Sequence, residues 1–265
     1  MRNNARPVAL VTGASSGIGA SLARELAQDG HDLILCARRV EPMRALANEL
    51  KASGCACTII PADLGKGGAA AALVQEIEAK GLIVDVLINA AGLGANGRFD
   101  LADPLRLSEM LAVNVVALTE LTRLLVPGMV RRRKGRVMLV ASTAAFQPGP
   151  QMAVYCATKA YVLSFGEAIA FELKGTGVTV TTLCPGATET EFSRVARAGR
   201  SALFKGGLVR VMGASEVARI GYQSLKAGRG VVIAGLLNRI MATSSRLSPA
   251  PVTLRIANWM MSTRK

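Results

Sequence analysis

Apolar and polar positions follow one another along this chain in blocks. Seven continuous apolar runs are typical of strands and lie at residues 7–12, 32–37, 57–62, 84–92, 135–142, 178–186 and 230–235. Most of them are separated by longer stretches in which apolar residues recur at helical spacing. Continuous apolar strands indicate a parallel sheet that is covered by helices on both faces. Because crossovers are right-handed, the pattern predicts an α/β fold with a doubly wound, seven-stranded parallel sheet.

Glycines mark the ends of the predicted helices. Gly30, Gly54, Gly81 and Gly177 each follow such an end, where a left-handed residue is needed. Neither a repeat nor a linker-like stretch interrupts the pattern. The simplest division is therefore a single domain over residues 1–265.

The charge is strongly unbalanced. The chain has 32 Lys and Arg against 18 Asp and Glu, a formal net charge of +14, which favours an anionic partner such as phosphate, nucleic acid or lipid headgroups. No acid follows Glu216. The basic run at 131–134 is expected to close a helix, where cations favour the C-terminal dipole, rather than to form a nucleic-acid patch.

Targeting segments and metal ligands are not evident. A strand-like run begins by Val8, and no window of 18 apolar residues was found, so a cytoplasmic protein without a leader or membrane span is expected. The five cysteines include no C-x-x-C pair, which indicates reduced core thiols rather than a metal site. His31 is the single histidine and is expected in a loop, which argues against a histidine-dependent triad.

A glycine-rich turn follows the first predicted strand. In "VTGASSGIG" at 11–19, Gly13, Gly17 and Gly19 permit a tight turn and close approach to a phosphate, and Ser15 and Ser16 add hydroxyl donors. The helix start that follows favours an anion. The alternative is a glycine-rich connection without a ligand. A Walker phosphate loop is excluded because it needs a Gly-Lys-Ser/Thr sequence.

The second predicted strand ends in "CARR". An acid at this point binds the ribose 2′-hydroxyl in proteins that use NAD, but here Arg38 and Arg39 stand in its place. A guanidinium suits a 2′-phosphate through its charge and its paired donors. NADP(H) is therefore favoured over NAD(H). The alternative is that both arginines are merely solvated.

Tyr155 and Lys159 in "YCATK" are four positions apart and share one helix face. A nearby ammonium favours the phenolate, so the pair predicts a tyrosine whose pKa is lowered towards neutrality, a tuned proton donor. The same spacing is equally compatible with two surface residues of an amphipathic helix.

Taken together, these motifs resemble those of a known family. "TGASSGIG", "NAAG" at 89–92, Asn114, Ser142 and Tyr155-x-x-x-Lys159 resemble the short-chain dehydrogenase/reductase family, in its shorter subfamily. The resemblance covers residues 8 to 190 and implies a Rossmann-type fold.

The resemblance implies four catalytic residues. Tyr155 is expected to act as the general acid in carbonyl reduction, or as the base in alcohol oxidation. Lys159 is expected to grip the nicotinamide ribose and lower the tyrosine pKa. Ser142 is expected to polarise the substrate oxygen, and Asn114 to hold a water in a proton relay.

The resemblance also implies cofactor contacts beyond the arginines. Asp63 is expected at the adenine, and Asn89 at the sheet edge beside the cofactor. Ala90 replaces the second asparagine of the commoner N-N-A-G. The other expected contacts are Gly13, Ser15, Ser16, Gly17, Ile18, Gly19, Gly92, Tyr155, Lys159, Pro185, Gly186, Thr188 and Thr190.

Two segments carry further expectations. Residues 187–213 are expected to form a substrate lid with Phe192, Leu203, Phe204, Leu208 and Met212, which suits an apolar substrate; a phosphate- or CoA-bearing substrate is the alternative. The basic, apolar extension at 236–265 is expected to form a short helix after Pro251, with Leu254, Ile256, Trp259 and Met260 available for burial. Packing is the expected role, and weak peripheral contact with an anionic membrane is the alternative.

The sequence therefore predicts an NADPH-dependent oxidoreductase that transfers a hydride between the nicotinamide and a carbonyl or secondary alcohol of an apolar substrate, such as a ketone, a ketoacyl compound or a steroid-like molecule. A second hypothesis stays open. That hypothesis is a non-catalytic NADP(H)-binding or membrane-surface regulatory protein on the same fold. A homodimer or homotetramer is expected from the resemblance. Specific nucleic-acid binding is not expected, because no recognition-helix module is evident.

Overall fold

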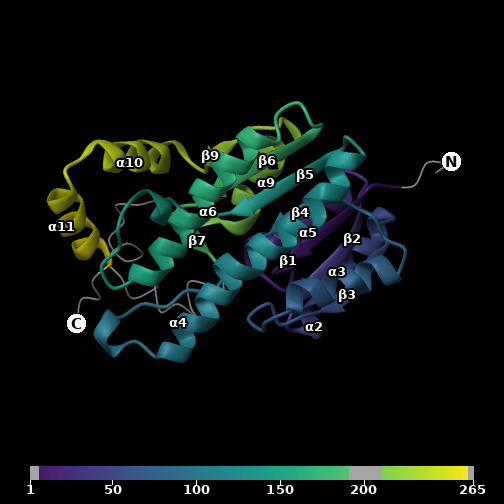
Figure 1. Ribbon diagram of the computed structural model, residues 1–265, viewed down its shortest axis with the longest axis horizontal. Coiled ribbons are helices and arrows are strands. Elements are labelled where there is room, and N and C mark those ends of the chain that lie inside the picture. The colour runs from purple at the N-terminus through teal and green to yellow at the C-terminus, as the bar shows by residue number, and fades with distance from the viewer. Residues whose placement is uncertain (1–5, 191–210, 262–265) are drawn as a thin grey trace.

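The computed structural model is built around a seven-stranded parallel sheet (Figure 1). It describes residues 6–190 and 211–261, with the backbone alone at positions 246, 247, 250, 252, 256 and 259–261. The sheet order is β3-β2-β1-β4-β5-β6-β9. Each predicted apolar run contains one strand of this sheet, so the predicted doubly wound sheet is confirmed. The strands are β1 (Val8–Thr12), β2 (Asp32–Ala37), β3 (Cys57–Pro61), β4 (Val84–Asn89), β5 (Gly135–Val140), β6 (Val178–Cys184) and β9 (Val231–Ile233).

Helices cover both faces of the sheet, as Figure 1 shows. One layer holds α1 (Gly17–Gln28), α2 (Val40–Leu50) and α9 (Ala214–Lys226); the other holds α3 (Ala69–Ala79), α5 (Leu118–Arg131) and α6 (Ala153–Glu172). Alternate residues of β1 enter the two layers: Ala9 and Val11 pack in the first, and Leu10 packs in the second. All three are 0% exposed, which explains why the strands are apolar without alternation.

The glycines predicted at helix ends are left-handed. Their φ angles are 83° at Gly30, 66° at Gly54, 67° at Gly81 and 85° at Gly177. His31 lies between α1 and β2 as expected, but its side chain is buried, with Nδ1 3.1 Å from the carbonyl oxygen of Leu26.

One helix was missed from the sequence. In α9, the residues Val217, Ala218, Tyr222 and Leu225 are buried and pack in the layer that contains α1. Their spacing is helical and was a readable signal. Two further helices, α10 (Leu236–Leu247) and α11 (Ala250–Met261), lie beyond β9, where only a short helix after Pro251 was expected.

Most of the segment between β4 and β5 is one long helical rod, from Pro104 to Arg131. Pro104 starts α4 (Pro104–Leu111), and the Asp103 side chain caps it by accepting a hydrogen bond from the Leu105 amide at 3.0 Å. A π-helical segment (Ala112–Ala117) joins α4 to α5. By length and composition alone, Pro104–Arg131 could cross a membrane, with a mean hydropathy of 1.5 over its most apolar window. Here Leu121 and Met129 of this rod are fully buried in the domain core.

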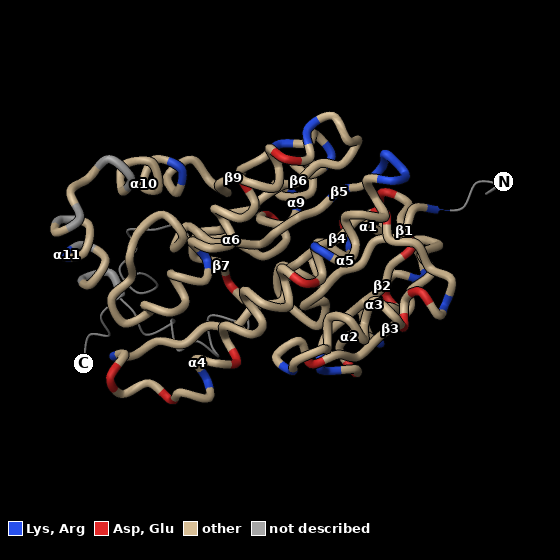
Figure 2. The backbone as a smooth tube through the Cα atoms, viewed as in Figure 1, with Lys and Arg blue, Asp and Glu red and all other residues tan. Residues whose placement is uncertain are grey.

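The basic run at 131–134 follows the end of α5 and forms a cationic loop beside the start of β5 (Figure 2). Arg131 lies in the last turn of α5, as the capping prediction requires. Two neighbours bond carbonyls of other segments: Arg132 donates to Val84 at 2.9 Å, and Arg133 donates to Gly175 at 3.3 Å. The run thus ties α5 to the amino ends of the strands.

No disulfide joins the cysteines, although the thiols of Cys55 and Cys57 lie within hydrogen-bonding distance, 3.6 Å apart. All five cysteines are free, as the sequence predicted, and four of them are buried; Cys57 is half-buried.

Candidate active site

A cavity of about 740 Å³ lies along the carboxyl ends of the strands. Crevices at this edge are where doubly wound sheets bind ligands, and the volume lies within the usual range for small-molecule sites. It brings together most of the residues predicted from sequence. Those that line it are Gly13, Ser15, Ser16, Gly17, Ile18, Gly19, Arg38, Arg39, Asp63, Ala90, Gly92, Ser142, Tyr155, Lys159, Pro185, Gly186, Thr188 and Thr190.

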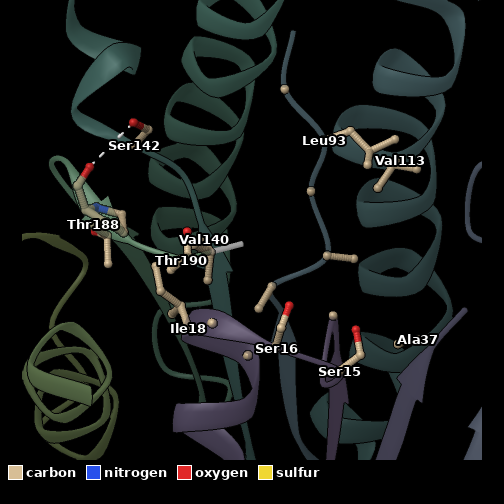
Figure 3. Close-up of a pocket in the computed structure, with 18 of the residues that line it drawn as sticks. Ser15, Ser16, Ile18, Ala37, Leu93, Val113, Val140, Ser142, Thr188 and Thr190 are labelled. Atoms are coloured by element: carbon tan, nitrogen blue, oxygen red, sulfur yellow. Dashed lines mark hydrogen bonds between the residues drawn. The ribbon is translucent and has the colours of Figure 1, made fainter. Parts of the chain in front are cut away.

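The turn between β1 and α1 forms the floor of this cavity, where Figure 3 shows Ser15, Ser16 and Ile18. Gly13 and Gly17 are left-handed, with φ of 68° and 57°. A side chain at Gly13 would lie 2.8 Å from the Ala90 carbonyl oxygen, and one at Gly19 would overlap the Gly13 carbonyl oxygen. The turn therefore accepts only glycine at these points, and α1 begins directly at Gly17.

Tyr155 and Lys159 project from α6 into the same cavity. The Lys159 Nζ atom lies 5.8 Å from the Tyr155 ring centroid. Tyr155 is 8% exposed and Lys159 is 5% exposed, so the alternative of two surface residues is excluded. Lys159 is held by a residue that the sequence did not point to: its Nζ donates to the Val140 carbonyl oxygen at 2.8 Å.

Ser142 follows β5 and faces the same group. Its hydroxyl makes a hydrogen bond with Tyr155, donates to the Pro185 carbonyl oxygen at 3.4 Å, and accepts from the Ala144 amide at 3.1 Å. Figure 3 shows Ser142 opposite the turn that carries Thr188. The hydroxyl is therefore oriented by the end of β5 and by the turn after β6.

Burial sets the protonation of the pair. It raises the pKa of Tyr155 to about 12, against a smaller lowering by the hydrogen bond with Ser142. Burial also lowers the pKa of Lys159 to about 8. The expected lowering of the tyrosine pKa is therefore wrong, because the removal of the phenol from water outweighs the effects that favour the phenolate. At neutral pH the phenol keeps its proton.

Asn114 lies in the π-helical segment, behind the cavity wall. Its Oδ1 accepts from the Leu93 amide at 2.8 Å, and its Nδ2 donates to the Leu93 carbonyl at 2.9 Å and to the Thr158 hydroxyl at 3.0 Å. A side chain at Gly92 would lie 3.5 Å from both Asn114 Oδ1 and Lys159 Nζ. The amide thus sits close to the lysine, although it does not line the cavity. A π-bulge at such a point is a frequent feature of functional sites.

Asn89 is also withdrawn from the cavity. Its side chain is 2% exposed and donates to the Thr122 hydroxyl at 3.0 Å, so it links β4 to α5. The neighbouring Ala90 lines the cavity, and its amide and that of Ala91 donate to the Thr12 hydroxyl at 3.1 Å each. Of the expected roles for Asn89, steadying the sheet edge has support in these contacts.

The two arginines after β2 point in different directions. Arg39 reaches the phosphate turn, with its Nη2 3.4 Å from the Ser15 hydroxyl and 3.5 Å from the Ser16 hydroxyl. Arg38 instead forms an ion pair with Glu109, at 2.7 Å. Asp63 accepts from the Gly65 amide at 3.2 Å beside them. Glu109 was not singled out from the sequence because its partner lies 71 residues away.

The turn after β6 lines the cavity next to Ser142. The Thr188 hydroxyl donates to the Gly186 carbonyl at 3.0 Å, and the Thr190 side chain would meet a side chain at Gly17 at 3.1 Å. Gly186 packs so closely on Asn238 of α10 that an added side chain would overlap its amide. The extension after β9 thus supports this turn. Of the expected lid residues, Met212 is buried, and Phe192, Leu203, Phe204 and Leu208 lie outside the described residues.

The cavity fits a dinucleotide. At the start of α1, the glycine turn leaves backbone space that a side chain at Gly13 or Gly19 would fill. Arg38 and Arg39 line one end of the cavity. A hydroxyl, a phenol and an ammonium lie at the other end. Within the described residues, no group of three or more His, Cys, Asp or Glu side chains is placed to hold a metal ion.

Fold and site together define a dinucleotide-binding α/β protein with a Ser-Tyr-Lys constellation. The model of the short chain dehydrogenase family matches residues 7–201 of the chain. The protein belongs to this family.

Several known proteins are similar to the chain. Ketoacyl reductase HetN of Nostoc sp. is 36% identical over 67% of this chain and 62% of its own length. A short-chain dehydrogenase from Sphingobium yanoikuyae, solved in complex with NADPH, is 32% identical, with a TM-score of 0.78 over 90% of this chain and 92% of that one. A 3-oxoacyl (acyl-carrier-protein) reductase from Agrobacterium tumefaciens with NADP bound is 28% identical, with a TM-score of 0.75 over 86% of this chain and 93% of that one. The chain spans about three fifths of the length of the first curated relatives that it matches.

Proposed function

We propose that the protein is an NADPH-dependent oxidoreductase that reduces a carbonyl, or oxidises the corresponding secondary alcohol. The observation that carries this proposal is the meeting of Ser142, Tyr155 and Lys159 at one end of a cavity whose floor is a phosphate-type turn. A non-catalytic binding protein has no physical need of a buried phenol and ammonium beside a serine hydroxyl.

The residues of the site divide the work of a carbonyl reduction. A bound NADPH supplies the hydride, and the product alcohol takes one proton in addition. Tyr155 holds that proton at neutral pH, since its pKa is about 12. The Ser142 hydroxyl lies beside Tyr155, where it can donate a hydrogen bond to the substrate oxygen and stabilise the negative charge that develops there. Lys159 keeps a positive charge beneath them, and Asn114 stays the proposed relay residue that connects to this lysine.

Several features support NADP(H) as the cofactor. Arg39 lies over the phosphate turn, and Arg38 lines the cavity beside it. An acid, which would bind a free ribose hydroxyl, is replaced by these arginines. Two of the similar structures hold NADPH or NADP. We therefore propose that Arg38 and Arg39 recognise a 2′-phosphate.

The surroundings of Tyr155 support an apolar carbonyl substrate. Met110, Ala144, Met152 and Cys156 pack around the tyrosine as a buried apolar cluster, with Leu93 against it. The relative HetN is named a ketoacyl reductase. We propose a ketone or a ketoacyl compound as the substrate class. Assembly as a homodimer or homotetramer stays a prediction.

Replacement of the phenol tests the catalytic assignment. Tyr155→Phe removes the proton donor, and general acid catalysis contributes about 10²–10⁴-fold, so the oxidation of NADPH by a panel of ketones is expected to fall by about that factor. NADPH binding, followed by the fluorescence of the cofactor, is expected to persist.

The matched control is Tyr161→Phe on the same helix. Tyr161 is 37% exposed, and its hydroxyl lies 2.9 Å from that of Thr119, away from the cavity. Its loss is expected to leave turnover unchanged. Equal turnover in Tyr155→Phe and wild type, or failure of every carbonyl tested in wild type, would contradict the proposed activity.

A further inference from the structure

Three charged side chains form a chain of ion pairs at the arginine end of the cavity. Glu109 Oε1 lies 2.7 Å from Arg38 Nη1, and Glu109 Oε2 lies 3.0 Å from Arg106 Nη1. We call Arg38, Glu109 and Arg106 the rim triad. One carboxylate is thus shared between an arginine of the cavity wall and an arginine of its own helix.

The position of Glu109 beside the cavity is well defined. It stands one helical turn before Val113, which lines the cavity. A side chain added at Gly65 would lie 3.2 Å from Glu109 Cγ and 3.3 Å from Asp63 Oδ1. Glu109 therefore packs against the loop that follows β3, next to the residue expected at the adenine.

The pairing occupies an arginine that the cofactor would need. A guanidinium presents its donors in a planar fork that binds a carboxylate or a phosphate in the same way. Arg38 is half exposed and points one of its terminal nitrogens at Glu109. A 2′-phosphate that binds Arg38 must compete with this carboxylate, which also repels the phosphate charge.

Arg106 makes the competition persistent. It contacts the second carboxylate oxygen from the same helix, three residues earlier, so Glu109 keeps one cationic partner near the cavity when Arg38 turns towards a ligand. The negative charge then remains close to the bound phosphate.

We infer that Glu109 weakens the recognition of a 2′-phosphate by competing for Arg38, and so sets how strongly the site prefers NADP(H) to NAD(H). This inference rests on the proposed dinucleotide site but not on the proposed reaction. Arg38 binds the phosphate, and Glu109 acts through Arg38 as a specificity-determining, positioning residue.

Binding of cofactor fragments tests the inference without turnover. Calorimetry is carried out with adenosine 2′,5′-bisphosphate and with 5′-AMP on wild type and Glu109→Gln. Because exposed ion pairs are weak, the bisphosphate is expected to bind Glu109→Gln about threefold more tightly, while the affinity for 5′-AMP changes by less than about 1.5-fold. Glu120→Gln, which removes an exposed acid from α5 in the same rod, is the control for net charge and is expected to change neither affinity.

A second variant shows whether Arg38 mediates the effect. In an Arg38→Gln background, Glu109→Gln is expected to give little further gain in bisphosphate affinity, because the competition no longer exists. Equal tightening of both fragments, weaker binding of the bisphosphate by Glu109→Gln, or a full gain without Arg38 would each overturn the inference. If wild type binds both fragments equally, the proposed NADP preference fails, and the effect of Glu109→Gln still decides the present inference.

Discussion

The two ends of the cavity differ in how their side chains are held. At the Tyr155 end, Tyr155 and Lys159 are buried, and hydrogen bonds to backbone carbonyls hold Lys159 and Ser142. At the Arg38 end, they are charged, partly exposed and held mainly by one another. Buried hydrogen bonds fix an atom in place, whereas exposed ion pairs are weak and exchange partners readily. The buried core thus positions the residues proposed for catalysis. The preference for one cofactor depends on the charged residues at the Arg38 end, which single substitutions can alter.

The phosphate turn joins the two ends, and its disruption is expected to have the largest effect. Gly19→Ala places a methyl group against the Gly13 carbonyl oxygen, so the turn must shift. NADPH affinity, measured by fluorescence titration, is expected to fall by more than about 100-fold, since the backbone can no longer approach the phosphates. Gly67→Ala is the control, because nothing lies within 4 Å of its added side chain. Normal binding by Gly19→Ala would show that the turn does not hold the cofactor.

The buried end is expected to lose stability when its hydrogen bonds are removed. Asn114→Ala leaves the amide and carbonyl of Leu93 without their partner in a half-buried loop. The free energy of unfolding, measured with urea, is expected to fall by about 2 kcal/mol, and turnover is expected to fall with it. Asn48→Ala on the exposed face of α2 should change neither quantity. An unchanged urea midpoint for Asn114→Ala would mean that this end is not held as the contacts suggest.

The protonation of the same end predicts the pH dependence. Lys159 loses its charge above a pKa of about 8, whereas Tyr155 keeps its proton up to about 12. The rate of carbonyl reduction is expected to be level below pH ~8 and to fall about tenfold per pH unit above it. In Lys159→Arg the guanidinium does not titrate, so whatever rate remains should not show this fall. A wild-type profile without the descending limb would contradict the assignment to Lys159.

Arg39, at the arginine end of the cavity, is expected to affect binding alone, and by the smallest factor. Arg39→Gln removes a cation next to Ser15 and Ser16, and the KM for NADPH is expected to rise about fivefold while kcat stays unchanged. Added salt should raise the KM for NADPH in wild type and have less effect on that of the variant, because exposed charges are screened. A loss of kcat in Arg39→Gln would break the separation between the two ends.

Much of the fold was readable in the sequence because burial on both faces of a sheet leaves continuous apolar runs. All seven strands of the parallel sheet were predicted in this way, and the left-handed glycines Gly30, Gly54, Gly81 and Gly177 were predicted from their places after helix ends. Helix α9 was not predicted, although Val217, Ala218 and Leu225 recur at helical spacing.

The residues of the candidate site also fall into two groups, those that the sequence predicted and those that it did not. Residues within one local motif, such as Gly13 with Gly19 or Tyr155 with Lys159, were found because their spacing along one turn or helix fixes their geometry. The partners Val140, Glu109 and Asn238 were not found, because each reaches the site from a distant segment.

The sequence by itself determined the sheet, the phosphate turn and the residues offered for chemistry, because local spacing and apolar periodicity dictate these. Only the tertiary structure decided how the residues are poised. It turned the Lys159 ammonium towards Val140, raised the pKa of Tyr155 instead of lowering it, and paired Arg38 with Glu109. Charge interactions depend on distance and desolvation, and both arise only when remote segments of the chain pack together.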